Sequence, residues 1–289
     1  MIKHWIREEK YISIVGGVYV SEIVTNFLPK IFDTYKLNGD RAINFQVSVH
    51  ENTFSTASIL LTVVNIESYI RRIFYFEKSR EFSCLKISKI FQKKNPSFPE
   101  QSFLDILSEV FVIRDIIVHN HVYDIRTKPD DAWNIISCTQ NLAIGNPDKK
   151  HKNCIDNEFK SKILRLNAQP LKIGFEDLFT VLAIFDLFVN LSKSMLGNGY
   201  VPFNFAHKFN DQWEDNFSKI MAHYYWKIQD KGYINFFNKL FSKLRKEYLQ
   251  FISNREDSIL ENSCPKCETF GFKNIRDING CPYCKFKIT

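Results

Sequence analysis

Hydrophobic residues recur at steps of three and four along residues 52–76, NTFSTASILLTVVNIESYIRRIFYF. This spacing places apolar side chains on one face of an α-helix, and those that carry it are Ile59, Val63, Ile66 and Ile70. Asn52 and Thr53 are candidates for the N-cap, and Glu67 and Arg71 form a helix-supporting pair four residues apart. The pattern predicts one long amphipathic helix.

A second helix is predicted over residues 102–118, SFLDILSEVFVIRDIIV. The preceding loop contains Pro96 and Pro99, which oppose helix formation, and Ser102 is a candidate for the N-cap.

Two further helical stretches follow. Residues 175–195 begin with Glu176 and Asp177, whose charges suit the first turn of a helix. Residues 209–250 continue the helical period, with a break predicted near Gly232.

The remaining segments are less regular. A helix containing Pro29 is predicted near residues 20–36, and residues 127–173 form a polar connection. Within that connection, residues 162–174 alternate apolar and polar side chains, which predicts one or two short strands. The chain is therefore expected to be mainly α, divided into an N-terminal extension (1–50), a main helical domain (51–200), a C-terminal helical segment (201–261) and a cysteine-rich end (262–289).

Composition agrees with a soluble globular protein of 289 residues, since 45% of the residues are hydrophobic and 25% are charged. The formal charge of +7 is compatible with a polyanionic partner. The most apolar stretch, 175–191, contains three acidic residues and is short for a membrane span, so a buried helix is expected. We therefore expect a cytoplasmic protein without a membrane partner, whose cysteines serve as thiols or metal ligands.

Two Cys-x-x-Cys pairs, CPKC and CPYC, lie 13 residues apart near the end of the sequence. Two such turns supply four thiolates to one tetrahedral Zn²⁺, and the intervening residues suffice for a β-hairpin. The predicted ligands are Cys264, Cys267, Cys281 and Cys284. Redox pairs of the thioredoxin type need a surrounding α/β domain, which 28 residues do not supply.

The predicted element is a small zinc ribbon over residues 262–289. Four thiolates leave no open coordination position, so the zinc is expected to be structural. Five Lys and Arg side chains make the ribbon basic, and nucleic acid or a protein are both candidate partners for it. The remaining cysteines, Cys84, Cys138 and Cys154, have no metal-ligand spacing and are interpreted as small buried side chains.

Residues 114–121, RDIIVHNH, combine an arginine, an aspartate and two histidines at the end of the second predicted helix. The letters HNH do not indicate an HNH endonuclease, because three adjacent residues cannot reproduce a metal site spread over a hairpin and a helix. Arg114 and His119 are separated by four residues, and Arg114 and His121 by six. Asp115 lies one helical turn before His119, where it is expected to orient the imidazole and raise its pKa.

This arrangement resembles the HEPN ribonuclease family, whose motif is Arg, four to six residues and His near the end of a helix. The resemblance covers roughly residues 50–200 and implies a HEPN-like helical bundle, here joined to a small β zinc ribbon. It implies a homodimer in which two motifs face one cleft, with Arg114 and His119 as catalytic residues. His121 remains an alternative to His119, and Glu67 on the first long helix is a candidate supporting residue or a solvent-exposed partner of Arg71.

The implied activity is endoribonuclease cleavage without a catalytic metal, through the 2′-OH to a 2′,3′-cyclic phosphate. A histidine that titrates near neutrality suits the proton transfers, and a guanidinium suits the developing charge on phosphorus. By family analogy the protein is a candidate toxin or antiviral, abortive-infection effector, with an antitoxin or other regulatory partner as a further expectation.

Three alternatives stay open. In the first, the helical body is a non-catalytic RNA- or nucleotide-binding dimer with a nucleic-acid-binding zinc ribbon. In the second, the chain is unrelated to HEPN proteins, and Arg114 and Asp115 only pair at a helix end. In addition, the basic and aromatic segment 233–251 is either an RNA contact or an amphipathic core helix; its period favours the core.

The ribbon assignment predicts about one zinc per chain after purification without a chelator, because each Cys-x-x-Cys pair supplies two of four ligands. Elemental analysis measures the ratio, and replacing Cys264 and Cys267 with Ser is expected to abolish it. A ratio near zero in the unsubstituted protein contradicts the assignment.

Overall fold

The described part of the chain folds mainly into α-helices, as the periodicity predicts. The computed structural model describes residues 20, 22–37, 47–119, 123–128, 131–140, 153–201, 207–209, 212–214, 217–228, 230–253, 255 and 258–261. The helices are α3 (Leu28–Leu37), α4 (Val49–Phe76), α5 (Ile87–Lys94), α6 (Glu100–His119), α8 (Phe175–Leu196), α9 (Phe217–Tyr225) and α10 (Lys231–Tyr248). The structure also has two antiparallel hairpins, β1 (Tyr123–Lys128) with β2 (Asp131–Gln140), and β3 (His207–Phe209) with β4 (Gln212–Glu214).

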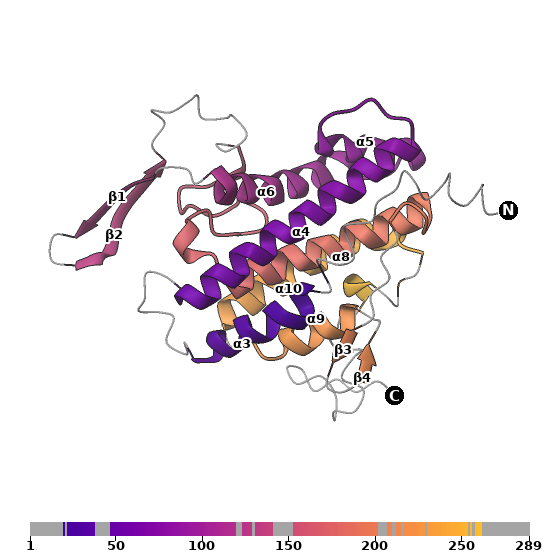
Figure 1. Cartoon of the computed structure of the whole chain (residues 1–289). Helices are drawn as coiled ribbons and strands as arrows, with labels where there is room; N and C mark the ends of the chain where they lie inside the picture. The colour runs from indigo at the N-terminus through magenta and orange to yellow at the C-terminus, as the bar shows by residue number, and fades with distance from the viewer. Residues whose placement is uncertain are drawn as a thin grey trace, which may run out of the picture.

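Helix α8 lies at the centre, and 17 of its 22 residues are buried. A helix that is apolar on nearly all sides needs neighbours on all sides to cover it. Figure 1 shows α4 running alongside α8, with α5 and α6 on one side of this pair and α3, α9 and α10 on the other. The buried side chains form one hydrophobic cluster that extends from Val20 to Leu260 within the described residues.

Polar contacts hold the start of α4 against the start of α8. The buried Glu51 carboxylate accepts a hydrogen bond from the backbone N–H of Phe175 at 2.9 Å. A carboxylate at this position is favourable, because the N-terminus of a helix has unpaired N–H groups and partial positive charge. The side-chain amide of Asn52 donates to the carbonyls of Pro170 and Ile173 at 2.6 and 2.9 Å.

The opposite ends of the two helices also meet. The Arg72 guanidinium on α4 donates to the carbonyl of Gly199, just beyond α8, at 3.0 and 3.3 Å. Tyr200 donates its hydroxyl hydrogen to Glu77 at 2.9 Å. Helices α4 and α8 therefore run parallel and are fastened together at both ends.

Two predicted helix caps are wrong. Ser48 is the N-cap of α4, where its hydroxyl accepts the N–H of Glu51 at 3.2 Å, so that Asn52 and Thr53 lie inside the helix. Helix α6 begins at Glu100, ahead of the predicted cap Ser102. In both cases the helix extends upstream of its apolar pattern into residues that the periodicity does not mark.

The strands predicted within 162–174 are not formed. Leu164, Leu166 and Ala168 are buried, which accounts for the alternation, but the backbone between them is irregular. Side-chain carboxylates bind several of its N–H groups, and its backbone pairing includes an isolated β-bridge between Asn167 and Lys160. Glu109 on α6 accepts the N–H of Ile163 and of Leu164, both at 2.8 Å, and Asp177 accepts the N–H of Asn167 at 2.8 Å.

The β1–β2 hairpin, absent from the sequence-based expectations, projects away from the helices in Figure 1. The helix expected over 209–250 is divided into α9 and α10, and its first residues belong to the β3–β4 hairpin. The break lies within 226–230, just before Gly232, and Asp230 caps α10 by accepting the N–H of Tyr233 at 3.0 Å.

At the N-terminal side, the helix predicted near 20–36 is present but begins with a π-helical turn, Ile23–Phe27, followed by α3. Pro29 follows this π-helical turn inside a continuous helical run over residues 22–37. The predicted core role of α10 is confirmed, since Phe237, Leu240, Leu244 and Tyr248 are buried.

Because Gly174 lies at the close contact between α4 and α8, an added methyl group there is expected to destabilise the fold. A Cβ there lies 2.7 Å from Glu51 Oε1 and 3.0 Å from Val47 Cγ1, although the backbone, with φ −140°, suits any residue. Gly174→Ala is therefore expected to lower the free energy of unfolding by about 1–3 kcal/mol. Urea denaturation measures the change.

Gly199→Ala is the matched control, because its Cβ meets no atom within 4 Å. We expect a change of no more than about 0.5 kcal/mol there. Equal effects of the two substitutions contradict the close packing of Glu51 against Gly174.

Candidate functional site

Helix α6 emerges from the core at the sequence that carries the Arg-x4-His pattern. Val110 to Ile113 are buried, whereas the side chains of Arg114 and Asp115 are 28% and 23% exposed and Val118 is 53% exposed. The helix ends at His119. The predicted position of the pattern, near the end of a helix, is thus confirmed.

The Arg114 guanidinium lies between two carboxylates. Its Nη2 donates to Glu67 Oε1 on α4 at 2.8 Å, and its Nε lies 2.9 Å from Asp115 Oδ1. A pair as exposed as Arg114 and Glu67, with 28% of each side chain accessible, contributes only about 0–1 kcal/mol to stability. Its main effect is therefore to fix the direction of the guanidinium relative to α4 and α6.

The Nη1 edge of the Arg114 guanidinium faces neither carboxylate. Arginine carries five N–H groups in a planar fork. Nε and Nη2 face the carboxylates, whereas Nη1 has no hydrogen-bond partner among the described residues. Within the described part of the chain, two N–H groups of this cation are therefore without a partner and suit an anion such as a phosphate oxygen.

Asp115 and Glu67 contact Arg114 in ways that the sequence did not specify. Asp115 was expected to orient His119, and its carboxylate is found against the guanidinium of its neighbour Arg114. Glu67 was a candidate supporting residue or a partner of Arg71, and its carboxylate bonds Arg114 on another helix. Glu67 thus contacts Arg114 directly, and its supporting role in a site stays a prediction.

The rest of the predicted site lies outside the described residues. This holds for the side chain of His119, for Asn120 and His121, and for the predicted zinc ligands Cys264, Cys267, Cys281 and Cys284. Their roles stay predictions. In the described ranges, the structure has no cluster of three or more His, Cys, Asp or Glu suited to a metal ion.

Cys84 lies close to the cluster of Arg114, Glu67 and Asp115, called the Arg114 cluster below. Its spacing in the sequence does not indicate this position. It begins the short turn Cys84–Lys86, which packs against α4 and α6. Burial raises the pKa of its thiol, while the charges of Arg71 and Arg114 lower this pKa and that of Glu67 raises it. The side chain is only partly buried, whereas Cys154 is buried as predicted. The side chain of Cys138, on β2, lies beyond what the structure describes.

Helix α8 is the one described helix that is long and apolar enough to span a membrane, and 83% of its most apolar window is buried inside the protein. Comparisons with protein-family models, with curated proteins and with solved structures found no match to this chain.

The proximity of Cys84 to Glu67 and Arg114 predicts opposite shifts of its thiol pKa. Arg114→Ala removes a positive neighbour and is expected to raise the pKa, whereas Glu67→Gln removes a negative neighbour and is expected to lower it. The pH dependence of iodoacetamide alkylation at Cys84, followed by peptide mass spectrometry, measures both shifts.

Lys239→Ala on α10 removes a charge from a helix outside this cluster and serves as the control. Shifts of the same sign in the two cluster variants are incompatible with the arrangement described.

Proposed function

We propose that this protein is an endoribonuclease of HEPN type that cleaves RNA without a catalytic metal. The observation that carries the proposal is the fixed guanidinium of Arg114, held by Glu67 and Asp115 five residues before the helix end at His119, with two N–H donors left over. This combination supplies a cation for a phosphate and places a histidine close along the chain.

The proposed reaction needs only proton transfer and charge stabilisation. The 2′-oxygen attacks the adjacent phosphorus, its proton passes to a base, and the bond from phosphorus to the 5′-oxygen breaks as an acid protonates that oxygen. The products are a 2′,3′-cyclic phosphate and a 5′-hydroxyl. His119 is assigned the proton transfer, with His121 as the alternative, because imidazole titrates near neutral pH.

Arg114 is assigned to the phosphoryl group. As the 2′-oxygen attacks, negative charge develops on the non-bridging oxygens. The Nη1 groups donate hydrogen bonds to these oxygens, and the bonds strengthen in the transition state. Glu67 is assigned a positioning role, since it prevents the guanidinium from rotating away. The negative charge of Glu67 also offsets part of the positive charge of Arg114. The affinity of the site for a phosphate group therefore depends on the balance between positioning and neutralisation.

A second histidine and arginine are proposed to come from a second copy of the chain. In-line cleavage requires both a base and an acid, and one copy supplies few candidates for these roles. A homodimer that brings two Arg114–His119 pairs to one cleft provides them. A zinc ribbon at the C-terminus is proposed to contact RNA or a partner protein, and a role as a toxin or antiviral effector follows from the family analogy alone.

RNA cleavage in the presence of EDTA tests this proposal. Arg114→Ala and His119→Ala are each expected to lower the cleavage rate by about 10²- to 10⁴-fold, because each removes a group used in the transition state. His121→Ala identifies which histidine acts. The product end is checked for a cyclic phosphate by mass spectrometry.

Lys239→Ala, an exposed charge on α10, is the control and is expected to cleave at the unsubstituted rate. Equal rates for all variants refute the proposed mechanism, as does activity that disappears with EDTA while the zinc content of the protein stays unchanged. Binding of RNA without cleavage favours the alternative, a non-catalytic RNA-binding dimer.

A further inference from the structure

The positive charge of the chain is concentrated in one short segment. Residues 71–94 contain eight Lys and Arg and two Glu, a net charge of +6, whereas the whole chain of 289 residues carries +7. This segment comprises the end of α4, the following loop, the Cys84–Lys86 turn and α5. The exposed basic side chains in it are Arg71, Lys78, Arg80, Lys89, Lys93 and Lys94.

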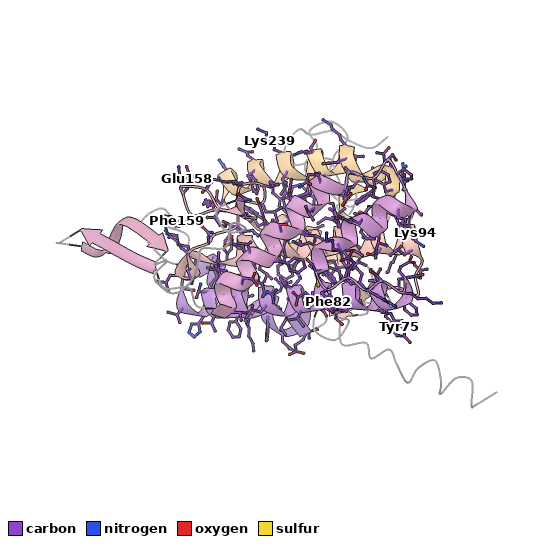
Figure 2. The ribbon with its side chains drawn as sticks, turned by 90° about the horizontal axis from the view of Figure 1, so that it is seen from above. Tyr75, Phe82, Lys94, Glu158, Phe159 and Lys239 are labelled. Atoms are coloured by element: carbon purple, nitrogen blue, oxygen red, sulfur yellow. The ribbon has the colours of Figure 1, made fainter. Side chains whose placement is uncertain are left out.

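The same segment exposes large aromatic side chains. Phe82 is 86% exposed and Tyr75 is 60% exposed, and Figure 2 shows both on the same side of the molecule, opposite Lys239. An exposed phenylalanine contributes nothing to the core, and among cationic neighbours it offers a flat apolar face next to positive charge. Bases of a single strand stack on such faces while Lys and Arg bind the phosphates.

Ion-pair, hydrogen-bond and ring contacts hold this surface in place. Lys94 pairs with Glu77 at 3.0 Å, and Tyr200 bonds the same carboxylate. The Arg72 guanidinium lies over the ring of Phe76, 5.1 Å from its centroid, and the Phe76 and Tyr200 rings are 5.1 Å apart. These contacts use one acidic residue and part of the basic set to hold the segment against the end of α8. The other cations remain at the surface.

The surface is continuous with the Arg114 cluster. Arg71 follows Glu67 by one turn on α4, and both residues influence Cys84, as does Arg114. The Cys84–Lys86 turn, which packs against α4 and α6, connects the loop that carries Phe82 to that cluster. A strand bound along the loop therefore has a short path to the free edge of Arg114.

The other basic and aromatic helix lacks this combination. On α10, Lys239 and Lys243 accompany aromatic residues, but Phe237, Phe241 and Tyr248 are buried and are not accessible to a base. Exposed cations alone bind phosphate without distinguishing single strands from duplexes.

We propose that residues 71–94 form the binding surface for single-stranded RNA, with Phe82 and Tyr75 as stacking platforms and the surrounding Lys and Arg as phosphate contacts. The identification of the polyanion as RNA rests on the proposed function. The surface itself is tested by binding, which does not require cleavage.

Fluorescence anisotropy of a labelled single-stranded RNA measures binding to the full-length protein carrying His119→Ala, so that the RNA stays intact. Phe82→Ala and Tyr75→Ala are each expected to weaken binding by about 5- to 150-fold, since stacking on one aromatic ring corresponds to about 1–3 kcal/mol per base. Lys89→Ala is expected to make the logarithmic salt dependence shallower by about 0.7, the value for one phosphate of a single strand.

Leu171→Ala and Lys239→Ala are the matched controls, because Leu171 is an apolar side chain exposed by 46% away from this segment and Lys239 is an exposed cation on α10. Both are expected to bind as the parent does. Equal binding by all variants overturns the proposal, as does equal affinity for a duplex of the same length or equally effective competition by poly-glutamate.

The two proposals fail separately. If the unsubstituted protein does not cleave RNA but binding depends on Phe82 and Tyr75, the surface is supported and the nuclease proposal is lost. If the protein cleaves RNA and binding does not depend on them, the surface proposal alone is overturned.

Discussion

The arrangement of the molecule depends on the contact between α4 and α8. Helix α8 is too apolar to face water, and α4 covers it along its length while carrying the polar groups that fasten both ends. Glu51 accepts a hydrogen bond from the N–H of Phe175 in the first turn of α8, and Arg72 donates to the carbonyl of Gly199 just beyond its last turn. Because these anchors fix the rotation of α4 as well as its position, they also determine where Glu67, between them on the same helix, meets α6.

The charged groups around Arg114 orient its guanidinium more than they stabilise the fold. An arginine beside two carboxylates carries a net charge of −1 as a group, and such partly exposed pairs contribute little to folding. The basic segment 71–94 compensates for this on the neighbouring surface. In the proposed RNA complex, the surrounding cations attract the polyanion and the oriented guanidinium of Arg114 positions a phosphate. This division allows affinity and positioning to depend on different residues.

Sequence periodicity was sufficient for the long helices and insufficient for their connections. Ile59, Val63 and Ile66 reveal α4 because burial on one face repeats at the helical period. The alternation of Leu164, Leu166 and Ala168 has the same cause, alternate burial, yet carboxylates of Glu109 and Asp177 replace a strand partner. The bond between Glu67 and Arg114 joins residues 47 apart. Local spacing favoured Arg71 as the partner of Glu67, because periodicity contains no information about which helices become neighbours.

The end of α6 gives the candidate site a property of its own. Arg114 and His119 are held apart by five helical steps, about 7.5 Å of axial rise, whereas the same five residues in an extended chain span about 17 Å. Their separation is therefore a measure of whether the final turn of α6 is wound. The β1–β2 hairpin begins four residues after His119, so the final turn of α6 lies along the chain between Arg114 and the hairpin.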